Sequence, residues 1–217
     1  MTLSAPPPAL PRPAGENPSV TRILHQARAH FFVHGYSAFT MDDLATELGM
    51  SKKTLYVHFS GKDEIIGAVI EELGREIRAN ADALLADRHL NFTEKLRAFA
   101  DAMVRRLTQV HPRMMRDLQR FAPDLYLRIT EMREKNIPYV FGRFIAEGQQ
   151  AGMVRANADT AFAVQFFLQA MNGLIQPPVL EQLGLAPGEV VPRAIELFFG
   201  GLLTPAGRKA HEKLSVR

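Results

Sequence analysis

Residues 39–59 read FTMDDLATELGMSKKTLYVHF, and this stretch predicts two short helices joined by a tight turn. Thr40 can cap the first helix, because its hydroxyl can accept a hydrogen bond from a backbone N–H of the first turn. Gly49 follows the last apolar residue of that helix, where the chain needs a positive φ that glycine adopts without strain. Ser51 can then cap the second helix. The pattern indicates a helix-turn-helix.

The residues around this turn suit a helix that enters a groove of DNA. Ala45 is small enough to let two helices cross closely, and the second helix has apolar anchors behind it: Leu48, Met50 and Leu55. The first turn of that helix carries Lys52 and Lys53, which can meet phosphates and bases. The alternative is an ordinary helical hairpin whose lysine pair faces only water. The joint match of caps, small residue, glycine and anchors favours DNA binding.

The charge pattern supports DNA contact by its clustering and not by its total. The net charge is +3, and residues 19–67 contain five Lys or Arg and five Asp or Glu. The predicted DNA-binding region is therefore not basic in bulk. Three of its five cations lie between Lys52 and Lys62, whereas three of the acids precede the turn. Such clustering is what contact with phosphates requires.

The composition is that of a globular protein. The chain has 217 residues, of which 47% are hydrophobic, so it can bury a core in one or two domains. It has no cysteine, which excludes a disulfide framework and thiolate chemistry and fits a cytoplasmic location. No apolar run is long and uncharged enough to span a bilayer, and the N-terminus lacks the pattern of a signal peptide. We therefore expect no membrane partner.

Helical spacing of apolar residues continues along the rest of the chain. Asn17 and Pro18 can open a first helix, which Gly35 ends. The next helix should begin at residue 62, after a second capping box in residues 60–63. The later helices are expected at 62–85, 93–109, 112–121 (broken from its predecessor at Pro112), 124–150 with a kink at Pro138, 158–176 and 187–203. No strand-type alternation stands out, so the predicted fold is all-α.

The two ends of the chain are expected to lie outside the packed fold. Residues 1–16 are rich in proline, which predicts a disordered arm. An arm that touches DNA is the alternative, although Arg12 is its only cation. Residues 205–217 are basic, and we expect a frayed, solvated tail there.

Two histidines in the first helix have the spacing of metal ligands. His30 and His34 are four residues apart and could share one face of the helix. No carboxylate or cysteine lies near them in the sequence to complete a site, which favours structural histidines. The sequence therefore predicts no metal site and no cofactor.

The region from Thr21 to Val69 resembles the N-terminal domain of the TetR family of transcriptional repressors. The resemblance is carried by RIL…A…F…GY in the first helix, T-M-D-D-L-A at the start of the second, G-M-S-K-x-T-L-Y across the turn and H-F-x-x-K-D-E after it. Lys53 departs from the family, because many relatives have glycine at this position. It adds a charge on the groove side, and the base preference stays open.

The resemblance implies a division into domains. Residues 17–67 would form a three-helix helix-turn-helix DNA-binding domain, and residues 68–204 a larger C-terminal helical domain for ligand binding and dimerisation. Double-stranded DNA would be contacted at the reading helix and at the phosphates beside it. The predicted DNA-binding residues are Thr40, Met41, Ser51, Lys52, Lys53, Thr54, Tyr56, His58 and Lys62.

The C-terminal domain is expected to hold a small-molecule inducer and to pair two chains. Aromatic and methionine side chains at helical spacing are candidates for the ligand site, although such residues are more often plain core. They are Phe99, Met103, Met114, Met115, Leu118, Phe121, Tyr126, Phe141, Phe166 and Met171. The last two long helices have surplus apolar surface, which predicts a homodimer interface. Its candidate residues are Phe162, Phe167, Leu174, Ile195, Phe198, Phe199 and Leu202.

The predicted function is a ligand-responsive transcriptional regulator, a repressor that binds a near-palindromic operator as a dimer and is released by a small apolar or amphipathic inducer. One alternative is a DNA-binding activator or architectural protein without an inducer, and a cavity with room for a ligand would argue against it. Another is an enzyme. The sequence groups no nucleophile with a base and an orienting residue, and it has no glycine-rich phosphate loop, which disfavours that alternative.

Overall fold

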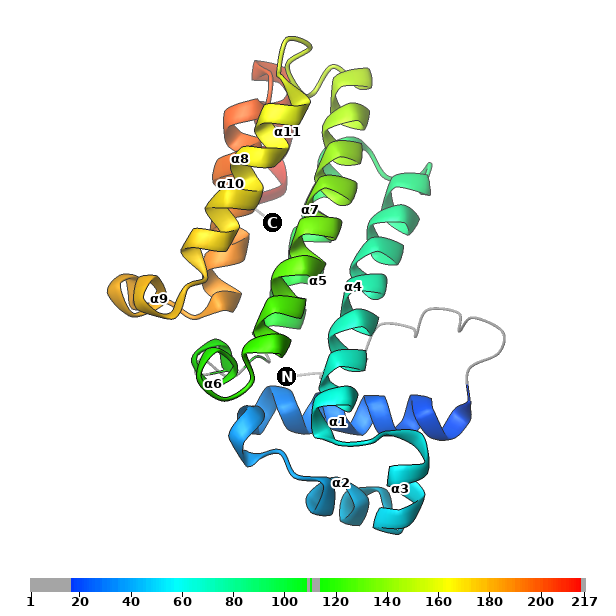
Figure 1. Ribbon diagram of the computed structural model, residues 1–217. Coiled ribbons are helices and arrows are strands. Elements are labelled where there is room, and N and C mark those ends of the chain that lie inside the picture. The colour runs from blue at the N-terminus through cyan, green and yellow to red at the C-terminus, as the bar shows by residue number, and fades with distance from the viewer. Residues whose placement is uncertain (1–16, 109, 111–113, 216–217) are drawn as a thin grey trace, which may run out of the picture.

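The computed structural model describes residues 17–108, 110 and 114–215, which form eleven helices and no strand. The predicted all-α fold is therefore confirmed. Three helices make up one end of the molecule: α1 (Pro18–Ala38), α2 (Met41–Leu48) and α3 (Lys52–His58). In Figure 1 they lie at the bottom, with α2 and α3 below α1. The predicted arm at 1–16 and the predicted break at Pro112 lie outside the described residues.

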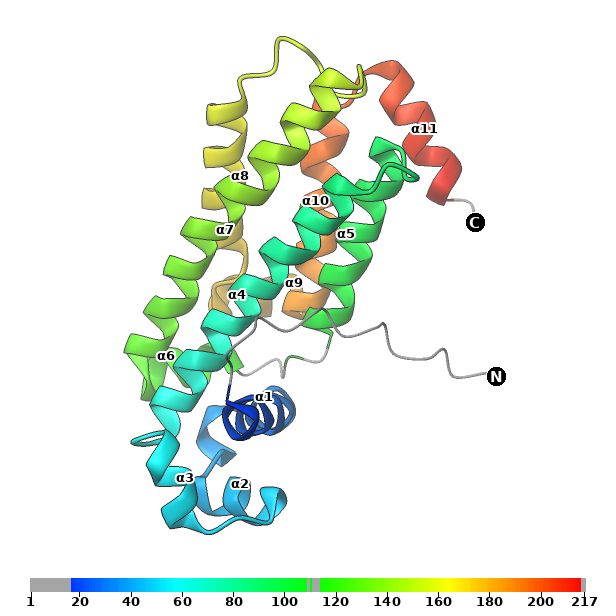
Figure 2. The ribbon, with the colours of Figure 1, turned by 90° about the vertical axis from the view of Figure 1, so that its right-hand side faces the viewer.

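The remaining helices form the body. They are α4 (Lys62–Ala86), α5 (Phe92–Leu107), α6 (Met114–Phe121), α7 (Pro123–Gln150), α8 (Thr160–Leu174), α9 (Pro177–Leu183), α10 (Pro187–Leu202) and α11 (Pro205–Ser215). The most extensive contacts between helices are those of α4 with α7, of α7 with α8, and of α5 with α10. Figure 2 shows α11 at the end of the body remote from α2 and α3. α4 alone begins beside α3 and continues through the body.

The structure confirms the local signals that predicted the first three helices. Asn17 caps α1, Thr40 caps α2 and Ser51 caps α3, each through a side-chain oxygen. Gly49 ends α2 with φ 63° and ψ 33°, the left-handed conformation expected of it. Gly35 leaves helical geometry at φ 78°, but the helix resumes after it for three residues.

Two expectations about the helices were wrong, and one short helix was missed. The helix from Lys62 has Gly61 as its N-cap, and Ser60 does not cap it; instead the Glu64 carboxylate accepts hydrogen bonds from the backbone and hydroxyl of Ser60. α7 runs through Pro138 as one helix, and the kink expected there stays a prediction. The expected frayed tail forms α11 as far as Ser215. The short helix α9 was not predicted, because its seven residues carry too little periodicity.

Two clusters of buried apolar side chains hold the molecule together. One surrounds α1, α2 and α3 and extends into α6 and the start of α7. The other fills the body around Phe141, whose ring lies 4.3 Å from that of Phe167 and 5.8 Å from that of Phe199, centroid to centroid. Since α6 packs on α1, the body contacts the first three helices through more than the α4 connection.

Candidate functional site

Local hydrogen bonds fix the position of α3. The hydroxyl of Thr40 accepts a hydrogen bond from the backbone N–H of Asp43 at 3.1 Å, and the hydroxyl of Ser51 accepts one from the backbone N–H of Thr54 at 3.1 Å. The turn between the helices is closed by the N–H of Met50, which donates to the carbonyl of Ala45 at 3.0 Å. Leu55 is the one residue of α3 that is fully buried. The helix is therefore anchored on one side, and its other side faces solvent.

The structure brings the nine predicted DNA-binding residues to this end of the molecule. Six of them are exposed: Thr40, Ser51, Lys52, Lys53, Thr54 and Tyr56. The other three are half-buried: Met41, His58 and Lys62. Tyr56 has 52% of its surface exposed, so it is available for contact and is not core packing. The arrangement suits a protruding helix that contacts a nucleic acid.

Two of these cations have partners on neighbouring helices, one of them acidic. Lys52 forms an ion pair with Asp42 on the preceding helix, and both side chains remain more than half exposed. Such an exposed pair contributes little stability, so a phosphate could replace the carboxylate at small cost. The Lys62 ammonium lies 3.9 Å from the centre of the Tyr36 ring and 3.4 Å from the Tyr36 carbonyl oxygen.

Tyr36 fastens α1 to the first turn of α4. Its hydroxyl donates to the Asp63 carboxylate at 2.9 Å. Burial raises the pKa of Tyr36 to about 12, and the hydrogen bond to the neighbouring Asp63 charge adds to the shift. The phenol is therefore neutral and a firm donor at physiological pH. This contact links the end formed by α1, α2 and α3 to α4, the helix that enters the body.

His30 has a structural role in the same region. Its Nδ1 lies 2.9 Å from Glu47, and Gln26 donates to the same carboxylate at 2.9 Å. These two hydrogen bonds, with that from Gln26 the larger cause, lower the pKa of Glu47. They tie α1 to α2. Among the described residues no group of three or more potential ligands could hold a metal ion, and His34 contacts His30 by its ring alone, at 4.6 Å between centroids.

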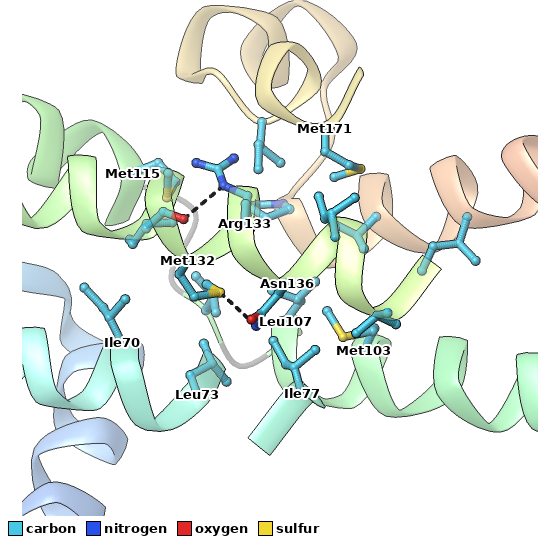
Figure 3. Close-up of a pocket in the computed structure, with 18 of the residues that line it drawn as sticks. Ile70, Leu73, Ile77, Met103, Leu107, Met115, Met132, Arg133, Asn136 and Met171 are labelled. Atoms are coloured by element: carbon cyan, nitrogen blue, oxygen red, sulfur yellow. Dashed lines mark hydrogen bonds between the residues drawn. The ribbon is translucent and has the colours of Figure 1, made fainter. Parts of the chain in front are cut away.

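A cavity of about 160 Å³ lies between α1 and the helices of the body. Its walls come from α1, α4, α5, α6, α7, α8 and α10 and are almost entirely apolar. Six of the ten predicted ligand-binding residues line it: Phe99, Met103, Met114, Met115, Phe141 and Met171. Figure 3 shows methionines entering from several sides.

Four predicted ligand-binding residues lie elsewhere. Leu118 is buried in the other core cluster, and Phe121 and Phe166 are exposed. Tyr126 lies outside the lining, partly buried. Leu118 and Phe166 lie on helices that do line the cavity, but they are on other faces of them.

Sequence reasoning missed the two polar residues in the cavity wall, Arg133 and Asn136. They belong to the stripe of α7 that also carries Ile129, Ile137 and Val140, all of which line the cavity. A charged residue within an apolar helical stripe is the signal that could have found them. Asn136 is well bonded: its amide donates to the Gly74 carbonyl at 2.9 Å and its oxygen accepts from Arg78 at 3.0 Å.

The predicted interface residues separate into two groups. Five of them lie inside the core of a single chain and are unavailable to a partner: Phe167, Ile195, Phe198, Phe199 and Leu202. Leu174 is half-buried and Phe162 is 70% exposed. Two further apolar side chains, Phe166 on α8 and Leu197 on α10, are also exposed. The exposed apolar surface of α8 and α10 is thus formed by Phe162, which was expected, and by Phe166 and Leu197, which were not expected there.

Comparison with known proteins places these features in context. A family model described as bacterial regulatory proteins of the tetR family matches residues 23–69. The chain is 25% identical over 181 residues to an uncharacterized HTH-type transcriptional regulator of Bacillus subtilis strain 168, YvaF, and the match covers 83% of this chain and 94% of that protein.

Solved structures are similar to most of this chain. The TetR transcription regulatory protein from Mycobacterium vanbaalenii is 26% identical with a TM-score of 0.55, and the match covers 85% of this chain and 94% of that one. The fatty acid degradation regulator FadR from Bacillus halodurans has the same fold, with 19% identity, a TM-score of 0.62, and coverage of 86% of this chain and 97% of that one. Within the described residues, no helix combines the length and apolar character that crossing a membrane requires.

Proposed function

Because this chain belongs to the TetR family of transcriptional regulators, we propose that it is a cytoplasmic repressor that binds a near-palindromic operator as a homodimer and leaves it when a small inducer enters the body. One observation carries the DNA-binding part of the proposal: α3 stands out from the molecule with its polar side chains exposed. Ser51, Lys52, Lys53 and Thr54 would lie nearest the bases, with Thr40, Met41, Tyr56, His58 and Lys62 at the DNA backbone.

The exposed apolar residues of α8 and α10 support a dimer. Phe162 and Phe166 are four residues apart, so they lie on one face of α8, and both have more than half of their surface exposed. Exposed aromatic side chains of this size are typical of an interface. A twofold dimer would present two copies of α3 to successive major grooves, which is why the operator should be near-palindromic.

The cavity supports regulation by an inducer. It is lined by helices of the body and also by Phe31 and Phe32 of α1, which belongs to the helix-turn-helix end. A ligand that binds better when these helices are displaced would shift the population towards a form with wrongly spaced reading helices. By thermodynamic linkage, the factor by which the ligand weakens operator binding equals the factor by which the bound operator weakens ligand binding. A ligand-sized cavity also argues against an architectural protein without an inducer.

Selection of randomised duplexes on the purified protein tests the DNA-binding proposal. We expect the selected sequences to share two inverted half-sites, and the affinity for them to fall at least tenfold in the double variant Lys52→Ala, Lys53→Ala. The slope of the logarithm of the binding constant against the logarithm of the salt concentration should become shallower by about 2 to 4 per dimer, because phosphate contacts are lost. The matched control is Arg208→Ala, Lys209→Ala, an exposed pair on α11 at the remote end. Selected duplexes without twofold symmetry, or a double variant with unchanged affinity and salt dependence, would refute the proposal.

A further inference from the structure

Arg133 is a buried cation that the described part of the protein leaves without an anion. The residue is 8% exposed. Its Nε donates to the Ile129 carbonyl and its Nη2 to the Thr130 hydroxyl, both at the long distance of 3.4 Å. Its Nη1 finds no hydrogen-bond partner among the described residues. No ion pair among those residues includes Arg133. Buried charges are normally paired, so this arrangement requires an explanation.

Lys95 is a second buried cation of the body, and unlike Arg133 it has an anionic partner. It is as buried as Arg133, at 6% exposed. Its ammonium donates to the Glu147 carboxylate at 2.7 Å and to the Leu85 carbonyl at 2.9 Å. The charge is thus neutralised by a carboxylate and satisfied by a second acceptor. Arg133 has no such partner, although the fold supplies one to Lys95.

The groups that face Arg133 do not replace an anion. The Tyr126 hydroxyl is close enough to stabilise the cation electrostatically, but it makes no hydrogen bond of normal geometry to any described residue. Glu134 contributes from an exposed position on the same helix. Burial outweighs both and lowers the pKa of Arg133 below its usual range. The guanidinium stays charged, since arginine is not deprotonated in proteins.

The position of Arg133 connects this cation to the cavity. Arg133 forms part of the wall, and Figure 3 shows its guanidinium between the labelled methionines Met115 and Met171. The rest of the wall is apolar apart from the well-bonded Asn136. The accessible surface of the cavity is apolar, so the guanidinium of Arg133 lies in the wall just behind that surface. A rotation of the Arg133 side chain would bring this unpaired cation against a molecule in the cavity.

We propose that the inducer is a small organic acid with a single carboxylate, which pairs with Arg133, and an apolar body that fills the cavity. This inference rests on the proposed function and specifies its ligand. The carboxylate is favoured because its two oxygens match the planar fork of a guanidinium. The size follows from the cavity of about 160 Å³, because a cavity of about 150 Å³ elsewhere holds benzene. The apolar body should contain about six to ten carbon atoms.

Calorimetric titration with matched acids and amides tests the role of the carboxylate. The probes are phenylacetate and octanoate, which represent a ring and a chain, each compared with its neutral amide. We expect at least one acid to bind, and to bind at least tenfold more tightly than its amide. The response to ring or chain then tells which shape the cavity accepts. Equal binding of acid and amide, or binding of neither acid, would overturn the inference.

Arg133→Met tests the residue itself. Methionine keeps much of the length of the side chain without its charge, so the variant should lose at least tenfold in affinity for the acid and little for the amide. Its melting temperature without ligand should be no lower than that of the wild type, since an unpaired buried charge has been removed. Arg128→Met is the control, because Arg128 lies on the same helix but is half exposed. Unchanged acid binding in Arg133→Met would show that Arg133 is only structural and would refute the proposal.

The operator duplex separates failure of this inference from failure of the proposed function. Arg133→Met should bind the selected duplex as tightly as the wild type but should no longer be released by the acid. If the wild type binds the duplex and no acid releases it, the inference fails while the DNA-binding function stands. If the wild type selects no duplex, the proposed function fails whatever the acids do.

Discussion

The DNA-facing end and the cavity of the body hold their functional side chains in opposite ways. At α2 and α3, each capping hydrogen bond joins residues three apart, and the side chains offered to DNA remain exposed. Around the cavity, the side chains come from seven helices and are buried by residues far away in the chain. Substitutions should therefore separate the two regions: those around the cavity should change stability, whereas those at α3 should mainly change DNA affinity.

The largest expected effect is that of Phe141→Ala. Phe141 lines the cavity, and its ring packs against four others, including those of Phe99 and Phe198 at 6.1 and 5.8 Å between centroids. Removing it should lower the free energy of unfolding by about 3 to 5 kcal/mol, because apolar burial is lost and the cavity grows. Urea denaturation measures the change.

Phe121→Ala is the control for this substitution, since Phe121 is 53% exposed and its removal should cost less than about 1 kcal/mol. Folded Phe141→Ala protein at low temperature should still bind the selected duplex. If Phe141→Ala were no more destabilising than Phe121→Ala, the cavity would not be a packed part of the core and the contrast between the regions would disappear.

The same contrast explains how much the sequence could predict. The caps Thr40 and Ser51 and the left-handed Gly49 act within a few residues, so their local pattern is sufficient to place α2 and α3. The cavity depends on which face of each helix is covered, and this is decided by distant helices. Phe166 and Phe167 are adjacent in an apolar helix, yet one is exposed and the other buried. Periodicity that wraps both faces cannot distinguish them.

Tyr36→Phe probes the contact that joins the two regions. Loss of the hydrogen bond from its hydroxyl to Asp63 should cost about 2 kcal/mol at pH 8. The folded pKa of about 12 lies above the usual 10, so the fold favours the neutral phenol. Its contribution is complete below pH 10 and is lost as the pH rises towards 12. The difference between wild type and variant should therefore shrink when urea midpoints are measured across that range.

Tyr139→Phe is the control for the pH series. The Tyr139 hydroxyl also donates to a carboxylate, that of Asp82 at 3.0 Å, but at an exposed position. The Tyr139→Phe substitution should lower the free energy of unfolding by well under 1 kcal/mol. A Tyr36→Phe variant whose destabilisation is equal at pH 8 and pH 11.5 would show that Tyr36 acts through packing alone.

Gly49→Ala tests the turn between α2 and α3. A side chain at Gly49 would meet nothing within 4 Å, so the cost comes only from the positive φ of 63° and should be about 1 kcal/mol. Gly142→Ala, where the space is equally open but the backbone is helical, should raise stability by about 0.5 to 1 kcal/mol. If thermal unfolding shows that Gly49→Ala lowers stability and Gly142→Ala raises it, the effect at Gly49 comes from its backbone conformation. Loss of stability in both variants would contradict this explanation.

Ser51→Ala is the smallest change and the most direct comparison between the two regions. It removes the cap of a seven-residue helix and should cost somewhat below 1 kcal/mol. Asn91→Ala removes the cap of α5 in the body, where the Asn91 side chain accepts from Glu94 at 3.1 Å, and should cost about the same. Only Ser51→Ala should weaken binding to the selected duplex, because the first turn of α3 is both held by this cap and offered to DNA. Equal loss of DNA affinity in the two variants would mean that affinity follows global stability, and that α3 has no separate part in reading DNA.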